Sequence, residues 1–141
     1  MPSPLVALIE DDQGVLQMLD LLLRDAGYRV TMCSLGKDAH DFVLHTMPDV
    51  IVLDLWLEDA DAGGMVLGLL ELDPMTRHIP VIICSAHLTA RRELAVYLQD
   101  KGYRIMEKPF QPDLLLAYIQ DAVENVTSGA HLQPHVRLRG H

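Results

Sequence analysis

Residues 50–55 read Val-Ile-Val-Leu-Asp-Leu, an aliphatic run that contains a single carboxylate, Asp54. Pro48 and Asp49 stand before the run, and an acidic loop that contains glycine follows it. An unbroken apolar run of this length is typical of a strand buried on both faces, as in a parallel sheet. We therefore expect Asp54 at the carboxyl end of a central strand, where open α/β sheets bind ligands.

The rest of the chain alternates similar apolar runs with segments of helical periodicity. The apolar runs predict strands over residues 5–9, 29–34, 50–55, 80–85 and 103–106. The periodic segments predict helices over residues 13–26, 37–46, 64–72, 88–101 and 113–126. In the third of these helices, Met65, Leu69 and Leu72 fall on one face. This alternation predicts an α/β fold with a doubly wound parallel sheet, because parallel crossover connections are right-handed.

The 141 residues carry a formal net charge of −9, and 50% of them are hydrophobic. Such a length suits one domain with its own core, over residues 1–126. From Thr127 onward the periodicity stops, so residues 127–141 are expected to form a disordered tail or a linker. Direct nucleic-acid binding is not expected, because it needs Lys and Arg side chains to neutralise phosphates.

The cysteines and the N-terminus indicate the compartment. Cys33 and Cys84 lie in apolar runs without C-x-x-C spacing, which is typical of buried thiols in a reducing environment. The N-terminus lacks the features of a signal peptide, and the chain has no apolar run of about 18 residues that would cross a membrane. The expectation is a cytoplasmic protein without membrane association.

Three of the five predicted strands finish in a polar residue. The first ends in Glu10 and Asp11, the third in Asp54 and the fourth in Ser85, while Lys108 follows the fifth. Parallel strands bring these residues to one edge of the sheet, although they are distant in sequence. Clustered carboxylates raise one another's pKa unless a cation lies among them. Mg²⁺ suits such oxygen ligands, and a Mg²⁺ ion is the expected cofactor.

Asp54 beside such a cation is a candidate nucleophile toward a phosphoryl group, since carboxylates act in this way in enzymes that form aspartyl phosphates. Phosphoryl transfer needs mainly positioning and charge neutralisation. Mg²⁺ and Lys108 would supply positive charge, and the Ser85 hydroxyl would donate a hydrogen bond to a phosphoryl oxygen.

Each of these residues also has a purely structural interpretation. Asp54 alone could be a helix cap or a surface acid, and Asp12 is better interpreted as the N-cap of the first helix than as a ligand. Lys108 alone would be a solvated charge, and Ser85 could simply satisfy a nearby backbone group. Their convergence on one edge favours the functional interpretation for Asp54 and Lys108.

Four motifs together resemble the receiver domains of two-component response regulators. They are the acidic pair Glu10-Asp11 and the stretches PDVIVLDLWL, PVIICSA and EKPF, which occur in the family's order and at typical spacing between residues 5 and 126. The resemblance implies a flavodoxin-like fold, with a five-stranded parallel sheet in the order 2-1-3-4-5 and five flanking helices.

The resemblance also implies roles for individual residues. Asp54 would be the phosphoacceptor, and Asp11 and Asp54 would bind Mg²⁺ directly. Glu10 would act as a ligand through water, and the backbone carbonyl of Trp56 would complete the metal site. Lys108 would take the position of the family's lysine, before a Lys-Pro bond that is characteristically cis.

Ser85 would take the family's Thr/Ser position near the phosphoryl group. The function implied is a switch controlled by Mg²⁺-dependent phosphorylation of Asp54, with a sensor histidine kinase or phosphotransfer protein as donor. Such a protein is not a conventional enzyme, since it catalyses only its own phosphoryl transfer and dephosphorylation. The face formed by the fourth helix, fifth strand and fifth helix would contact a downstream protein, an output domain or a second copy.

Two other functions remain open. One is a pseudo-receiver that binds partners without phosphorylation, which the loss of an acidic residue or of the lysine would favour, yet all are present. The other is a Mg²⁺-dependent hydrolase or nucleotide binder on the same fold. The chain has neither G-x-x-x-x-G-K-[ST] nor G-x-G-x-x-G, which disfavours it.

The loop after Asp54 departs from the family pattern, because it lacks the usual proline and is strongly acidic. Its extra acids are either a solvated charged loop or groups that act on phosphodonors and cations; they are Glu58, Asp59 and Asp61. Trp56 and His87 occupy the positions at which receivers tune the lifetime of the phosphoryl group.

A second departure is Ile105, which stands where receivers usually carry Tyr or Phe. Tyr103 shares its face of the predicted strand but lies about 7 Å further back. We therefore expect a population shift without an aromatic rotamer switch, carried by the loop after the fourth strand and by the fourth helix.

Overall fold

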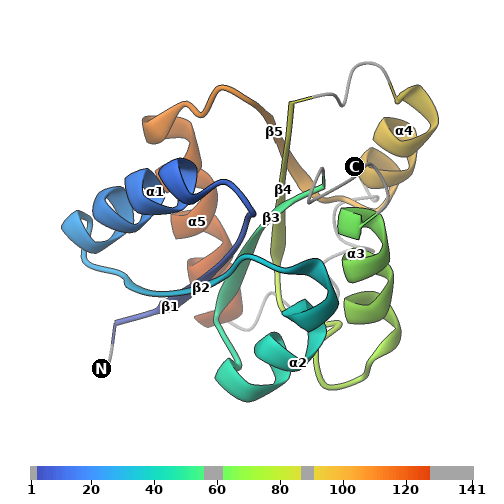
Figure 1. Cartoon of the computed structure of the whole chain (residues 1–141), viewed down its shortest axis with the longest axis horizontal. Coiled ribbons are helices and arrows are strands. Elements are labelled where there is room, and N and C mark those ends of the chain that lie inside the picture. Colours follow the sequence, from blue (N-terminus) through green and yellow to red (C-terminus); the bar gives the residue numbers. More distant parts are fainter. Residues whose placement is uncertain (1–2, 56–61, 87–90, 128–141) are drawn as a thin grey trace.

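The computed structural model describes residues 3–55, 62–86 and 91–127. Ten elements alternate along the described chain (Figure 1). They are β1 (Leu5–Ile9), α1 (Gln13–Asp25), β2 (Arg29–Cys33), α2 (Gly36–Thr46), β3 (Val50–Asp54), α3 (Ala62–Leu72), β4 (Val81–Ser85), α4 (Arg92–Asp100), β5 (Arg104–Glu107) and α5 (Pro112–Thr127).

The strands form one parallel sheet in the order β2-β1-β3-β4-β5. This confirms the predicted α/β doubly wound fold and its strand order. Leu53 of β3 is in register with Ile9 of β1 on one side and with Ile83 of β4 on the other. Because the strands are parallel and in register here, the carboxyl ends of β1, β3 and β4 meet at one edge.

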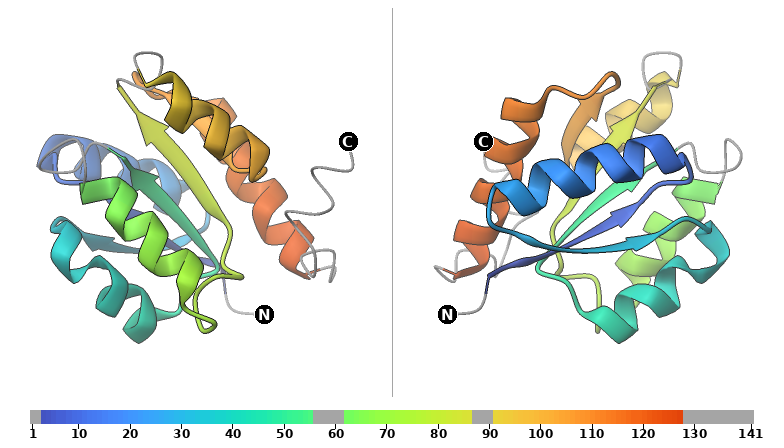
Figure 2. Two further views of the ribbon diagram at one scale, coloured as in Figure 1. Left: turned by 90° about the vertical axis from the view of Figure 1, so that its right-hand side faces the viewer. Right: turned by 60° about the vertical axis from the view of Figure 1, so that its left-hand side comes forward.

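Helices cover both faces of the sheet, with α1 and α5 on one face and α2, α3 and α4 on the other (Figures 1 and 2). The residues of β3 and Leu55, which follows it, alternate between the two layers. Val50 and Val52 pack in the cluster beneath α1 and α5, whereas Ile51, Leu53 and Leu55 pack in the opposite one. Burying one such aliphatic side chain contributes roughly 1.5–3 kcal/mol, so the strand that carries Asp54 is among the most firmly held elements.

The structure shows which face of α3 is buried. Met65, Leu69 and Leu72 share a face, but that face is exposed. The residues that pack inward are Gly63, Val66, Leu67 and Leu70. Almost all of α3 is apolar, so periodicity alone could not select the buried side. The choice follows from Gly63, which lies against the backbone of Leu55 so closely that an added Cβ would be 2.2 Å from the Leu55 oxygen.

Two helix starts differ from the predicted ones by more than one residue. Helix α3 begins at Ala62 rather than at residue 64, because Gly63 is part of its contact with Leu55, the residue after β3. Helix α4 begins at Arg92 rather than at Leu88, because Arg91 has a non-helical backbone (φ −121°, ψ 70°). Residues 88–90 themselves lie outside the described residues.

Helix α5 includes Thr127, which was predicted to begin the tail, and the remaining residues 128–141 lie outside the described part. The side chains of both cysteines are buried, as expected. Burial raises the pKa of the Cys84 thiol to about 12. Among the described residues, no helix is long and apolar enough to cross a membrane.

Candidate functional site

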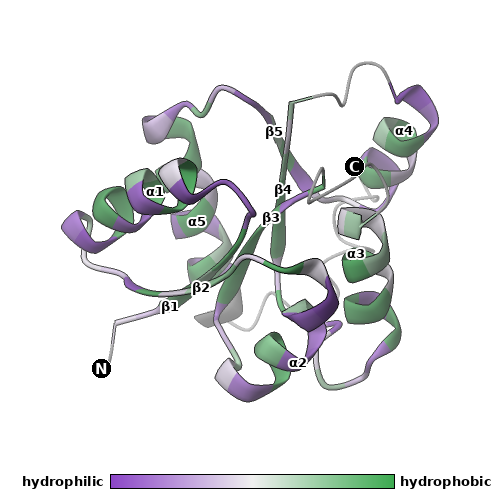
Figure 3. Ribbon diagram, viewed as in Figure 1, coloured by the Kyte–Doolittle hydropathy of each residue, from purple (hydrophilic) through white to green (hydrophobic). Residues whose placement is uncertain are grey.

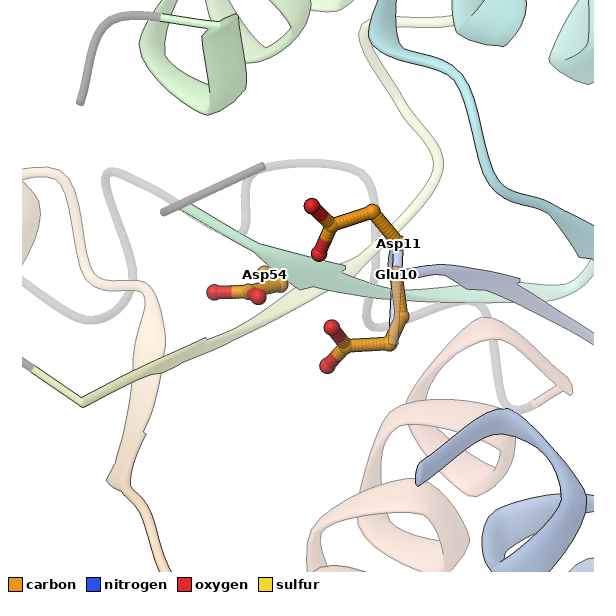
Figure 4. A group of neighbouring side chains, drawn as sticks. All are labelled: Glu10, Asp11 and Asp54. Atoms are coloured by element: carbon orange, nitrogen blue, oxygen red, sulfur yellow. The ribbon is translucent and has the colours of Figure 1, made fainter. Parts of the chain in front are cut away.

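Three carboxylates meet at the edge formed by β1 and β3. Glu10 and Asp11 directly follow β1, and Asp54 is the last residue of β3. Since Ile9 pairs with Leu53, the next residues, Glu10 and Asp54, come side by side. One oxygen of each acid lies within 4.8 Å of the others (Figure 4). Glu10 and Asp54 are only 3% and 4% exposed, whereas Asp11 faces solvent.

Lys108 reaches this cluster from the end of β5. Its Nζ donates hydrogen bonds to Glu10 Oε1 at 2.6 Å and to Asp54 Oδ2 at 3.1 Å. The Lys108 backbone N–H donates a hydrogen bond to the Ser85 backbone carbonyl at 3.0 Å. This bond ties the main chain at Lys108 to the end of β4. The Lys108–Pro109 bond is cis, as the family resemblance implied. The lysine therefore bridges two buried acids that come from different strands.

The electrostatics of the cluster indicate that a further cation would be favourable. Burial raises the pKa of Glu10 to about 7, and the Asp54 charge adds to this effect, while the hydrogen bonds from Lys108 and from the Asp12 backbone oppose it. Burial lowers the pKa of Lys108, but the hydrogen bond to Glu10 and the charges of Asp54 and Glu10 raise it overall. The Lys108 ammonium thus contacts two of three closely spaced carboxylates, and a small hard cation would neutralise the cluster further.

Ser85 and Asp12 also lie beside the acidic cluster. Ser85 is the last residue of β4 and is buried beside the acidic edge, since its neighbour Cys84 pairs with Asp54. Asp12 caps α1: its side chain accepts a hydrogen bond from the Val15 N–H at 3.1 Å. Its own backbone N–H donates to Glu10 Oε2 at 3.2 Å. Asp12 is therefore an N-cap, as predicted, and it also helps to orient Glu10.

Several residues singled out in the sequence lie outside the described residues. They are Trp56, Glu58, Asp59, Asp61 and His87. The described part of the site therefore consists of the acidic cluster, the serine and the lysine, all at the strand ends where the sequence placed them.

A family model for the response regulator receiver domain matches residues 6–120. This stretch is more than half of the chain and contains the whole described site. The chain belongs to the response regulator receiver family.

Several curated proteins are similar in sequence to this receiver domain. It is 36% identical over 120 residues to the transcriptional regulatory protein KdpE of Staphylococcus aureus. The matched region covers 82% of this chain and 48% of KdpE. It is 30% identical over 124 residues to protein Rrf1 of Nitratidesulfovibrio vulgaris. The matched region covers 88% of this chain and 86% of Rrf1. The chain spans about half of KdpE and about a quarter of a putative NtrX-like response regulator of Rickettsia typhi.

Solved structures of receiver domains share the fold. The receiver domain of a putative Luxo repressor protein from Vibrio parahaemolyticus matches with a TM-score of 0.80 and 28% identity, covering 94% of this chain and 99% of that one. The receiver domain of a sensor histidine kinase from Pseudomonas aeruginosa PAO1 matches with a TM-score of 0.75 and 25% identity, covering 86% and 98%. That second structure holds a magnesium ion coordinated in its active-site cleft.

One polar cluster of this receiver was missed by the sequence reasoning. The Tyr97 hydroxyl of α4 donates to Glu71 Oε1 of α3 at 2.7 Å, and the Tyr103 hydroxyl, just before β5, donates to Glu71 Oε2. The Tyr103 ring is partly buried against the core cluster beneath α2, α3 and α4. Burial and the Glu71 carboxylate raise the pKa of Tyr103, so its hydroxyl remains a donor. The partners are 26 and 32 residues apart, so no local pattern could reveal them.

Proposed function

We propose that this receiver is a phosphorylation-dependent signalling switch, which accepts a phosphoryl group on Asp54 from a sensor histidine kinase or a phosphotransfer protein. The observation that carries the proposal is the placement of Asp54. Its carboxylate is buried at the end of the central strand and accepts a hydrogen bond from the Lys108 ammonium at 3.1 Å. Glu10 and Asp11 lie beside it.

The donor set of the site fits Mg²⁺, since all three clustered side chains offer carboxylate oxygens. Asp11 and Asp54 would bind the ion directly and Glu10 through water, with the Trp56 carbonyl as a further ligand by family resemblance. When bound, Mg²⁺ would neutralise charge on the phosphoryl oxygens. The magnesium-containing receiver from Pseudomonas aeruginosa supports this assignment.

The proposed reaction is a displacement at phosphorus. An Asp54 carboxylate oxygen forms a new bond to phosphorus while the bond to the donor's leaving group breaks, which gives an acyl phosphate. Lys108 already contacts Asp54, so its ammonium is placed to donate a hydrogen bond to one phosphoryl oxygen once Asp54 is phosphorylated. The Ser85 hydroxyl would donate a hydrogen bond to another phosphoryl oxygen. Hydrolysis by water restores the carboxylate, and we propose no metabolic reaction beyond this cycle.

The alternative is a pseudo-receiver that is not regulated by phosphorylation. The retention of Glu10, Asp11, Asp54 and Lys108 in one cluster favours the phosphorylated switch over it, because a pure interaction module does not need buried acids that repel one another.

For the output, we propose the face of α4, β5 and α5, which would contact a downstream protein or an output domain. A groove of about 410 Å³ on this face supports the assignment; its lining residues are Ala95, Gln99, Ile105, Met106, Glu107, Gln111 and Leu114. The proposed compartment is the cytoplasm, where the buried thiols of Cys33 and Cys84 would stay reduced.

Mg²⁺ is expected to raise the melting temperature of the parent chain, because an ion that binds only the folded cluster stabilises it by about 2.7 kcal/mol at 100 times its Kd. Asp11→Ala should remove most of this response. Asp12→Ala is the matched control: it should lower the stability by about 1 kcal/mol through loss of the N-cap and keep the Mg²⁺ response.

Differential scanning fluorimetry with increasing Mg²⁺ measures the melting temperatures of the parent and of both variants. Trp56, the only tryptophan in the sequence, offers a second, fluorescence readout. A parent that responds in neither signal at millimolar Mg²⁺ would favour the pseudo-receiver.

Tyr103→Ala is expected to lower the stability of the fold through lost packing and to leave the response to phosphorylation intact. The ring is only partly buried, so we expect a loss of roughly 2 kcal/mol, less than for a fully buried aromatic side chain. Phosphorylation should still change amide exchange in α4, because the proposed switch does not use an aromatic rotamer. Tyr103→Phe, which keeps the ring and loses the contact with Glu71, is the matched variant. If the phosphorylation-dependent difference vanishes in a folded Tyr103→Ala chain, Tyr103 is part of the switch.

A further inference from the structure

Helix α4 packs less extensively than its neighbour α3. Within Arg92–Asp100, all of which the structure describes, only Leu98 is buried. Helix α3 buries four residues, namely Gly63, Val66, Leu67 and Leu70. In Figure 3, α3 is hydrophobic along most of its length, whereas α4 has hydrophilic stretches as well. Segments with few buried apolar contacts open at the lowest free-energy cost, so α4 is easier to displace than α3.

One carboxylate, that of Glu71, ties α4 to α3. Glu71 lies near the end of α3, and its Oε1 accepts a hydrogen bond from the Tyr97 hydroxyl of α4 at 2.7 Å. Its Oε2 accepts a hydrogen bond from the Tyr103 hydroxyl, just before β5. Burial and the Glu71 carboxylate raise the pKa of both tyrosines, that of Tyr97 to about 12, so both hydroxyls stay protonated and can donate.

Both tethered segments lead to residues of the phosphorylation site. Ser85 ends β4, and α4 is the next helix along the chain. Strand β5 begins directly after Tyr103 and leads to Lys108. The helix and the strand also belong to the face proposed for output. Glu71 therefore holds, from outside that face, two of the elements that would have to respond to a phosphoryl group.

The two hydrogen bonds of Glu71 differ in how easily they open. Tyr97 is 41% exposed, so water can replace Glu71 as the partner of its hydroxyl when α4 moves. The Tyr103 ring packs against the core cluster beneath α2, α3 and α4, and its hydroxyl keeps the Glu71 carboxylate in place. The bond between Tyr97 and Glu71 is thus the contact that a displacement of α4 would break.

We propose that the Tyr97–Glu71 hydrogen bond is a latch, which holds α4 against α3 in the unphosphorylated receiver and opens when Asp54 is phosphorylated. This inference rests on the proposed function, because it assigns the contact that opposes that switch. A contact made in only one of two states shifts their equilibrium by its net free energy. One hydrogen bond changes the ratio of the two populations about fivefold. The latch opens by movement of α4, so no ring has to change its rotamer.

Amide exchange of the full, unphosphorylated chain tests the latch itself. Tyr97→Phe removes the hydroxyl and keeps the ring, so exchange in α4 should become about fivefold faster, while exchange in β1 and β3 should stay as in the parent. Glu71→Ala loses both hydrogen bonds and should accelerate exchange in α4 further. Val96→Ala is the matched control, because Val96 is 56% exposed on the same helix; its α4 should exchange no faster than the parent's.

Titration with beryllium fluoride in the presence of Mg²⁺ tests whether the latch opposes the switch. Beryllium fluoride is a reversible analogue of a phosphoryl group, so its binding is measured at equilibrium by calorimetry. A ligand that binds the open state has an apparent Kd that falls as the open fraction rises. Tyr97→Phe should therefore bind it about fivefold more tightly than the parent, and Val96→Ala should bind it as the parent does.

Three results would overturn the latch and leave the proposed function intact. They are exchange in α4 of Tyr97→Phe that matches the parent, equal acceleration by Val96→Ala and Tyr97→Phe, and equal affinity of Tyr97→Phe and the parent for beryllium fluoride. A parent that binds no beryllium fluoride in the presence of Mg²⁺ would contradict the proposed function and, with it, this inference.

Discussion

Lys108→Met is expected to destabilise the metal-free receiver by about 3 kcal/mol, the lower end of the cost of leaving a buried charge without its partner. The lysine donates to both Glu10 and Asp54, which are almost fully buried. We choose the lower end because 19% of the Lys108 side chain is still exposed. Without the ammonium, two adjacent carboxylates would face each other with no cation between them.

Urea unfolding in buffer with a metal chelator measures this loss. Mg²⁺ should restore more stability to Lys108→Met than it adds to the parent, because the ion then supplies the missing positive charge. Lys37→Met is the control, since Lys37 is an exposed lysine on α2, and surface changes usually stay within about 0.5 kcal/mol. A Lys108→Met chain as stable as the parent would mean that the lysine does not hold the acidic cluster.

Gly63→Ala is expected to destabilise the receiver by about 1–3 kcal/mol or more, as overpacking does at a tightly packed position. The new Cβ would lie 2.2 Å from the Leu55 oxygen, so α3 and the end of β3 would have to separate. Leu55 directly follows Asp54, and we therefore also expect a weaker Mg²⁺ response from this variant.

Gly64→Ala is the matched control in the same helix. A Cβ at Gly64 meets nothing within 4 Å, and replacing a helical glycine by alanine gains up to about 1 kcal/mol. The two neighbouring substitutions should thus change the free energy of unfolding, measured with urea, in opposite directions. Equal effects would contradict the close contact between Gly63 and Leu55.

The strands were predictable because their physical signal is local. The aliphatic run of β3 must be buried on both faces, and parallel strands bring their carboxyl ends to one edge. From these two facts, the sequence alone predicts that five residues lie together, namely Glu10, Asp11, Asp54, Ser85 and Lys108. The structure adds the contacts of Lys108 with two acids and of the Asp12 backbone with Glu10.

The features that escaped prediction depend on tertiary contacts. The apolar residues of α3 surround most of the helix, so only the contact of Gly63 with Leu55 decides which face is buried. The hydrogen bonds from Tyr97 and Tyr103 to Glu71 join segments that no sequence period relates. The start of α4 was placed too early because its apolar residues, including Leu94 and Leu98, begin well after Leu88.

The most direct test of the proposed switch is the intact mass of the chain after incubation with Mg²⁺ and acetyl phosphate, followed by peptide mapping. The parent should gain the mass of one phosphoryl group, located on the peptide that contains Asp54, and chelation of the metal should prevent the gain. Asp54→Asn should remain unlabelled while keeping its fold. A parent that gains no phosphoryl group, or an Asp54→Asn chain that is labelled like the parent, would contradict the assignment of Asp54 as the phosphoacceptor.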